Sequence, residues 1–191
     1  VQGDLLNWPA INRALPQITF DHLICLAPYT SPFSDWLTQL KYSGRFEVAK
    51  LLAELMAEHL SESLSAVTLN NPIDSIACVP LHISKWQQRG YNQAHLIAKH
   101  FAQLIDKPYL SQIINRVKKT TSQVGQSGGA RRKNLKGAFT INFFGQPPPK
   151  HVLLLDDVVT TGATASEISR QLKRFGVKKV TVIAVCLTLP N

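Results

Sequence analysis

Apolar residues recur along the chain in two patterns, which together predict alternating strands and helices. Val48, Leu52, Met56 and Leu60 follow one another at helical spacing, so a long amphipathic helix is predicted over residues 45–64. The strands are predicted at 22–29, 76–79, 109–114, 139–143, 152–155 and 180–187, and the further helices at 32–40, 93–105 and 164–175. Continuously apolar strands joined by helices are typical of an α/β fold whose mostly parallel sheet is flanked by helices.

The composition fits one folded domain with a basic surface. Of the 191 residues, 45% are hydrophobic and 17% are charged, so a sizeable core is expected rather than a disordered tail. The net charge is +9. A charge of this sign favours polyanionic partners: nucleic acid, a phosphorylated small molecule or an acidic surface.

The three cysteines argue against disulfide and metal chemistry. Cys25, Cys78 and Cys186 stand far apart inside apolar runs, without CxxC spacing. We therefore expect buried thiols in a reducing compartment and no zinc site. No apolar stretch reaches the length of a membrane span, and the first residues lack the pattern of an export signal. A cytoplasmic protein is expected.

Residues 152–164 combine a strand, two acids and a turn rich in threonine. The apolar run ends in Asp156 and Asp157, and Gly162 lets the backbone approach a ligand closely just before a predicted helix. In open α/β sheets ligands bind beyond the carboxyl ends of strands, and a helix N-terminus attracts an anion. A purely structural interpretation, in which the acids end a strand and the turn caps a helix, explains each of these features alone. It does not explain why they occur together in this order. The acids need another partner, either sugar hydroxyls or a hydrated Mg²⁺.

Residues 155–164 resemble the motif by which type I phosphoribosyltransferases bind 5-phosphoribosyl-1-pyrophosphate (PRPP). The resemblance implies their Rossmann-like fold, in which the paired acids hold the ribose 2′- and 3′-hydroxyls and the threonine-rich loop holds the 5′-phosphate. The residues to which it assigns PRPP binding are Asp156, Asp157, Val158, Val159, Thr160, Thr161, Gly162, Ala163 and Thr164. Mg²⁺ is then expected to arrive with PRPP, and Asp156 or Asp157 is the candidate for any direct protein ligand.

A second loop, predicted over residues 79–93, carries Lys85 and Arg89 at the same edge of the sheet. From charge alone a solvated basic turn is the simpler interpretation, and His82, a candidate general base, is more often structural in such a position. Residues 80–82 and 89–93 are, however, similar to the signature of the ComF/GntX family of competence-associated, phosphoribosyltransferase-like proteins. This resemblance implies a pyrophosphate loop and gives Lys85 and Arg89 a catalytic role beside the two acids.

Residues 116–136 contain seven basic residues and no acid around a glycine-rich centre. Three interpretations are open: a solvated disordered loop, a lid over a polyphosphate, or a patch that binds nucleic-acid backbones. The lid is preferred, because type I phosphoribosyltransferases have a flexible catalytic loop here and the glycine-rich loop lacks aromatic residues for base stacking. The candidate lid or DNA-binding residues are Arg116, Lys118, Lys119, Arg131, Arg132 and Lys133.

The resemblance to the ComF/GntX family extends over roughly residues 22–190 and includes a Lys-aromatic segment at 40–44. It implies a hood-like N-terminal segment over residues 1–66 and a phosphoribosyltransferase-like core over 67–191. Pro9 and Pro16 predict that residues 1–20 form an irregular arm. Family members commonly begin with a four-cysteine zinc module, whereas this chain contains no CxxC pair. No zinc is therefore expected in it.

The resemblance also implies a function. It indicates a protein that binds PRPP with Mg²⁺ and acts in natural transformation, where it handles incoming single-stranded DNA with DNA-uptake or helicase proteins, in the cytoplasm or at the inner-membrane face. The alternative is an active phosphoribosyltransferase with an unidentified nucleobase-like acceptor, and a third interpretation is a scaffold with a vestigial phosphate site. The sequence identifies no residues that would recognise an acceptor. It leaves the oligomeric state open, with a dimer among the options.

Overall fold

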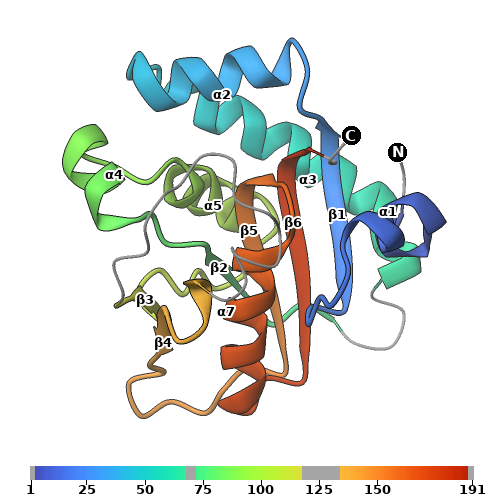
Figure 1. Ribbon diagram of the computed structural model, residues 1–191. Helices are drawn as coiled ribbons and strands as arrows, with labels where there is room; N and C mark the ends of the chain where they lie inside the picture. Colours follow the sequence, from blue (N-terminus) through green and yellow to red (C-terminus); the bar gives the residue numbers. More distant parts are fainter. Residues whose placement is uncertain (1–2, 68–71, 118–133, 189–191) are drawn as a thin grey trace.

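A four-stranded sheet forms the centre of the computed structural model, which describes residues 3–67, 72–117 and 134–188 (Figure 1). The strands lie in the order β1-β6-β5-β2, and each neighbouring pair is parallel. Their bounds are β1 His22–Pro28, β2 Ser75–Cys78, β5 His151–Val159 and β6 Lys179–Leu187. Strands β5 and β6 occupy the two central positions and are buried along almost their whole length, which accounts for their continuous apolar sequences. The predicted α/β class is confirmed.

Helices cover both faces of this sheet. One face carries α1 (Pro9–Ala14), α7 (Ala163–Arg174) and an antiparallel pair, β3 (Ile114–Arg116) with β4 (Phe139–Ile141). The other face carries α2 (Phe33–Tyr42), α3 (Glu47–Val67) and α5 (Gln93–Leu104). In Figure 1, α7 lies in front of the sheet and α3 and α5 lie behind it. Each group closes a separate apolar core against its face of the sheet.

Helix α3 follows from the apolar stripe in its sequence. Val48, Leu52, Met56 and Leu60 are at most 5% exposed, and they pack in the core that α3 shares with α5. Leu51, at the border of the stripe, is 39% exposed. The helix thus buries one face and leaves the other to solvent, as helical periodicity requires.

Residues 3–20 are more ordered than the irregular arm predicted over 1–20. They contain a short 3₁₀ helix, η1 (Leu5–Asn7), followed by α1. The buried Asp4 carboxylate organises this segment: it accepts hydrogen bonds from the backbone N–H groups of Leu6 and Leu23, each at 3.0 Å, and lies 2.7 Å from His22 Nδ1. Its partners on β1, His22 and Leu23, lie too far along the chain for a local sequence pattern to indicate these contacts.

Strand β5 is longer than the predicted strand at 152–155, and it contains both acids. It continues to Val159 because β6 pairs with it throughout, from His151 opposite Lys179 to Val159 opposite Leu187. Asp156 and Asp157 therefore lie within the sheet and not beyond its edge. Because Asp156 and Asp157 are polar, a prediction based on apolar residues ends the strand before them.

A short helix, α4 (Ile83–Arg89), replaces part of the loop predicted over residues 79–93. The His82 Nδ1 accepts a hydrogen bond from the Ser84 N–H at 3.2 Å and so caps its first turn, while Gly90 ends it in the left-handed conformation. The structure thus gives His82 a capping role. The strand predicted at 109–114 is also wrong in extent: Tyr109 makes a single bridge to Ile76, and β3 begins only at Ile114.

The two predicted parts of the chain share one sheet, because β1 comes from residues 1–66 and the other strands come from 67–191. The division at residue 66 stays a prediction. Throughout the described ranges, every helix is too short or too polar to cross a lipid bilayer.

Candidate functional site

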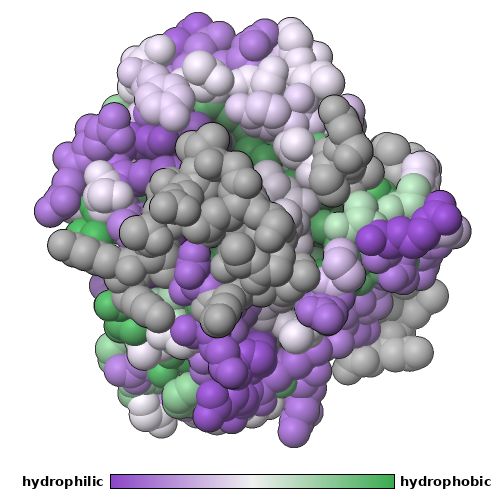
Figure 2. All heavy atoms as spheres, in the orientation of Figure 1, coloured by the Kyte–Doolittle hydropathy of each residue, from purple (hydrophilic) through white to green (hydrophobic). Residues whose placement is uncertain are grey.

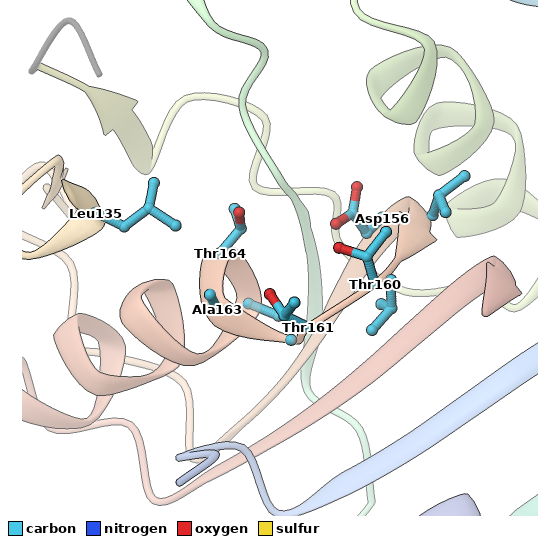
Figure 3. Close-up of a pocket in the computed structure, with 10 residues that line it drawn as sticks. Leu135, Asp156, Thr160, Thr161, Ala163 and Thr164 are labelled. Atoms are coloured by element: carbon cyan, nitrogen blue, oxygen red, sulfur yellow. The ribbon is translucent and has the colours of Figure 1, made fainter. Parts of the chain in front are cut away.

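A small cavity lies where β5 ends and α7 begins (Figure 3). Every residue from Asp156 to Thr164 lines it except Asp157, together with Leu135 and Ala165. Its volume is about 60 Å³, well above the roughly 15 Å³ that a single water molecule needs. The structure thus gathers almost the whole predicted phosphate loop around one space large enough for a small anion.

The turn at Gly162 presents the start of α7 to this cavity. Gly162 is the residue that precedes the helix, and its φ of 66° places it in the left-handed region that favours glycine. The first intrahelical bond runs from the Ser166 N–H to the Gly162 carbonyl at 2.8 Å. The first N–H groups of a helix have no acceptor within it, and the residues that carry them line the cavity. Together with the helix dipole they attract an anion.

Three threonines surround the same space. In Figure 3, Thr160 and Thr161 lie on the turn and Thr164 on the first turn of α7, with Asp156 on the adjoining strand. Hydroxyl groups donate hydrogen bonds to phosphate oxygens as backbone N–H groups do. The cavity lining therefore combines hydrogen-bond donors with a carboxyl group.

The two acids of β5 have different surroundings. Asp156 lines the cavity, and its Oδ1 accepts a hydrogen bond from the Asp157 N–H at 2.9 Å. Asp157 instead forms an ion pair with Lys41 from α2 and accepts a hydrogen bond from Gln93 at the start of α5. The two carboxyl groups also share a side-chain hydrogen bond, and their predicted joint action on one ribose stays a prediction.

The pKa values of these two carboxyls are shifted in opposite directions, because only Asp157 has the Lys41 ammonium beside it. Burial, and then the charge of Asp157, raises the pKa of Asp156 well above its usual value. Burial would also raise the pKa of Asp157, but the Lys41 ammonium and its hydrogen bond hold it below the usual value. Asp157 is therefore the carboxylate that carries the charge, and Asp156 resists ionisation.

Lys41 is the site residue that the sequence prediction missed. Its side chain is 15% exposed and that of Asp157 is 12% exposed, so the pair is almost shielded from water. Burial alone would lower the pKa of Lys41, but the facing Asp157 carboxylate more than offsets this and raises it. The available signal was the Lys-aromatic segment at 40–44, a lysine directly after a fully buried leucine in the last turn of an amphipathic helix.

Lys85 and Arg89 lie on α4 and outside the cavity lining. Lys85 is exposed. The Arg89 guanidinium donates a hydrogen bond to Gln93 Oε1 and lies 5.1 Å from the centre of the Tyr42 ring. In this structure Arg89 therefore joins α4 to α2 and α5, and its predicted role beside a pyrophosphate stays a prediction.

The basic segment can be followed only at its two ends. Arg116 is half-buried, with its guanidinium 5.4 Å from the centre of the Phe139 ring, while Lys118, Lys119, Arg131, Arg132 and Lys133 lie outside the described residues. At the other end of the segment, Leu135 lines the cavity. Just beyond it, the Gly137 N–H donates a hydrogen bond to Glu167 at 2.9 Å. The C-terminal end of the segment therefore lies beside the cavity, and the predicted action of the segment as a lid stays a prediction.

The three cysteines are free and buried, as predicted. Burial raises the pKa of Cys78 and of Cys186 to about 11, so both stay protonated thiols at neutral pH. Cys78 accepts a hydrogen bond from the Tyr109 hydroxyl at 3.0 Å. We assign these thiols to packing.

The acid pair does not by itself make a magnesium site. Within residues 3–67, 72–117 and 134–188, histidine, cysteine and carboxylate side chains nowhere gather in threes at metal-binding distance. The one carboxylate of the pair that is readily charged already has Lys41 as its counter-ion. Mg²⁺ prefers several oxygen ligands and keeps its waters, so these side chains alone do not fit it.

Comparisons with known proteins identify clear relatives. Competence protein F of Haemophilus influenzae is 36% identical over 86% of this chain and 72% of its own length. DNA utilization protein YhgH is 36% identical in Salmonella typhimurium and 34% identical in Escherichia coli K12, over 89% of this chain and 74% of each relative. No family model matches the chain.

Among solved structures the likenesses are remote. An adenine phosphoribosyltransferase has a TM-score of 0.45 at 15% identity, over 80% of this chain and 75% of that protein. The adenine phosphoribosyltransferase of Trypanosoma brucei has the same TM-score at 13% identity, over 76% of this chain and 66% of that protein.

Proposed function

The chain belongs to the family of competence protein F and DNA utilization protein YhgH, and from that premise we propose that its cavity binds PRPP, which arrives with its own Mg²⁺. The observation that carries the proposal is the cavity itself. It brings the N-terminus of α7, three threonines and a buried carboxyl group around one space. PRPP carries a 5′-phosphate, which can accept from the helix N-terminus and the threonines, and on the same sugar a vicinal diol, which can donate to the carboxyl group.

The site would divide the recognition of this ligand between two kinds of group. The N–H groups and hydroxyls from Thr160 to Thr164 would donate to the 5′-phosphate, with the helix dipole adding attraction. Asp156 would accept from a ribose hydroxyl, and Asp157 would reach the ribose only if its contact with Lys41 loosened. These residues bind and orient the sugar, and the proposal needs no chemical step.

Replacing Asp156 by asparagine should remove most PRPP binding without unfolding the protein. Asparagine keeps the Oδ1 that accepts the Asp157 N–H, but it replaces the second carboxyl oxygen by an NH₂ group, which cannot accept a hydrogen bond from a ribose hydroxyl. A polar group left without its partner costs about 1–3 kcal/mol, so affinity should fall roughly 5- to 150-fold. PRPP with Mg²⁺ at about 100 times its Kd should stabilise the wild type by about 2.7 kcal/mol. A thermal-shift titration measures both effects.

Asp74→Asn is the matched control, because Asp74 accepts a hydrogen bond from the His151 N–H at the opposite end of β5, at 2.9 Å. This variant should keep the full ligand shift. Ribose 5-phosphate and pyrophosphate, tested separately, show which half of PRPP is recognised. A wild-type protein that gains no stability from PRPP with Mg²⁺ would overturn the proposal.

We further propose that the protein handles single-stranded DNA during competence, as a cytoplasmic protein at the inner-membrane face with DNA-uptake or helicase partners. The names of its relatives support the part of this role that concerns competence and DNA. So does a surface beside α4 that we call the aromatic surface, formed by Tyr42, Phe46 and Trp86, which are 71%, 52% and 52% exposed. Trp86 lies one turn before Arg89, whose guanidinium stacks on Tyr42. Figure 2 shows hydrophilic side chains gathered over α4.

Removing aromatic rings from this surface should weaken binding to single-stranded DNA. Stacking of a base on an aromatic side chain contributes about 1–3 kcal/mol, so Tyr42→Ala and Trp86→Ala should each reduce affinity about 5- to 150-fold. Fluorescence anisotropy with a labelled oligonucleotide, repeated across salt concentrations, provides the measurement. Phe175→Ala is the control, since Phe175 is 52% exposed at the far end of α7. Equal affinities for all three variants would remove the aromatic surface from the proposal.

The alternative function is an active phosphoribosyltransferase acting on a nucleobase-like acceptor. In that reaction the bond from the ribose C1 to pyrophosphate breaks, a bond from C1 to an acceptor nitrogen forms, and the acceptor gives up a proton. Release of pyrophosphate in the presence of a panel of nucleobases distinguishes this enzyme from a protein that only binds PRPP.

A further inference from the structure

Lys41 fills the place beside Asp157 that a cation would otherwise take. It reaches this place from the last turn of α2, while Asp157 lies within the central strand β5. Their side chains are only 15% and 12% exposed. Removing one partner of a buried ion pair is strongly destabilising, because it leaves the other charge uncompensated, so the ammonium is a fixed part of the site.

The end of α2 that carries Lys41 is held by several contacts. The Tyr91 hydroxyl donates a hydrogen bond to the Leu40 carbonyl, and the Tyr91 ring packs edge-on against Phe46, with centres 5.0 Å apart. Arg89 stacks on Tyr42 and donates to Gln93. Gln93 in turn donates to Asp157. The residues on either side of Lys41 and its partner are thus linked in one network across α2, α4 and α5.

The charges around the acid pair are balanced by this arrangement. Asp157 faces the Lys41 ammonium and the Gln93 amide, with the Asp156 carboxyl next to it in the strand. Without Lys41, the Asp157 carboxylate and the neighbouring Asp156 oxygen would be two oxygen ligands open to Mg²⁺ or Mn²⁺, which would keep waters as its other ligands. With Lys41 in place, a dication has to displace a buried ammonium or approach it at close range, and Coulomb repulsion opposes both.

We propose that Lys41 is a specificity-determining residue: it is the built-in counter-ion that keeps free divalent cations out of the acid pair. The metal then enters only on the phosphates of a bound ligand. This inference rests on the proposed function for its biological meaning. Its test needs no PRPP, because it concerns the metal alone.

Mn²⁺ binding to the full chain, followed by the loss of the free Mn²⁺ signal in electron paramagnetic resonance, tests the inference. The wild type should show no site that depends on Asp157. Lys41→Met should gain one, at least tenfold tighter than any wild-type binding at this position, and Lys41→Met with Asp157→Asn should lose it again. Lys50→Met, at an exposed position on α3, should behave as the wild type.

Two results would overturn the inference. One is a wild-type Mn²⁺ site that disappears in Asp157→Asn, since Lys41 would then not exclude the metal. The other is a Lys41→Met protein that gains no Mn²⁺ site. If this variant is unfolded without metal, Mn²⁺ should restore its folded circular dichroism spectrum. A variant that stays unfolded with Mn²⁺ contradicts the inference in the same way. Absence of a PRPP shift in the wild type would leave these outcomes unaffected, so the two proposals fail separately.

Discussion

Replacing Lys41 by methionine should lower the free energy of unfolding by about 3–5 kcal/mol at neutral pH. Methionine keeps the length of the side chain and its apolar stem but removes the ammonium, which leaves the Asp157 carboxylate buried without its counter-ion. Since domains unfold with about 5–15 kcal/mol, this is a large part of the total. Urea denaturation followed by circular dichroism measures it.

The loss should shrink as the pH falls. A depressed pKa, as Asp157 has beside Lys41, contributes stability that is present above the unfolded-state pKa and is lost as the pH falls through the folded-state pKa. Without Lys41, burial and Asp156 would raise the pKa of Asp157, and protonation in mild acid would relieve the uncompensated charge. The wild type and the variant should therefore converge in stability toward acid pH.

Two further variants isolate the ion pair. Combining Lys41→Met with Asp157→Asn removes both charges and should recover most of the lost stability. Arg45→Met breaks the neighbouring pair with Glu47, where the side chains are 55% and 65% exposed, and should change stability little. If Lys41→Met unfolds at the same urea concentration as Arg45→Met, the buried pair is not a determinant of stability.

The phosphate loop was predictable because its information is local. A buried strand, a glycine with positive φ and a helix start follow one another within residues 152–164, and each has its own sequence pattern. The structure places them around one cavity. What local patterns did not indicate is that β5 extends through the acids, because that depends on β6 pairing as far as Leu187.

Lys41 was not predictable as a site residue for the opposite reason. Its partner Asp157 lies in a distant part of the chain, and the two meet only once α2 packs on the sheet face opposite α7. A lysine in the last turn of a helix is also a common way to complement the helix dipole, so its sequence context has an ordinary explanation. Burial, which changes that interpretation, is a property of the fold.

The signature at 89–93 makes contacts that its sequence did not indicate. The loop over 79–93 was predicted to be a pyrophosphate loop, a role that stays a prediction, and in the structure Arg89, Tyr91 and Gln93 contact α2, Phe46 and Asp157. These contacts connect the signature to Lys41 and so to the acid pair. The motif, the Lys-aromatic segment at 40–44 and the acids, which are separate in the sequence, form one structural unit.

Gly162→Val should abolish the stabilisation of the protein by PRPP with Mg²⁺. Gly162 has φ 66°, where a residue with a Cβ costs about 1–2 kcal/mol and a β-branched one more. An added Cβ would already touch Phe20 Cε1 at 3.4 Å and Ile18 Cγ2 at 3.5 Å, so valine adds two methyl groups to a position where these side chains are in contact. The turn must then move, and the N–H groups at the start of α7 no longer converge on the cavity. The same thermal-shift titration measures the loss.

The strain and the loss of the site can be separated with a second glycine. Gly145 has φ 79°, and a Cβ there would meet no atom within 4 Å, so Gly145→Val should lose comparable stability from the backbone alone and keep the full PRPP shift. Gly162→Asn, whose side chain tolerates the left-handed region, should lie between the wild type and Gly162→Val in both measurements. A Gly162→Val protein that still gains stability from PRPP would mean that the anion does not depend on the backbone of this turn, and the threonine hydroxyls would then have to account for its binding.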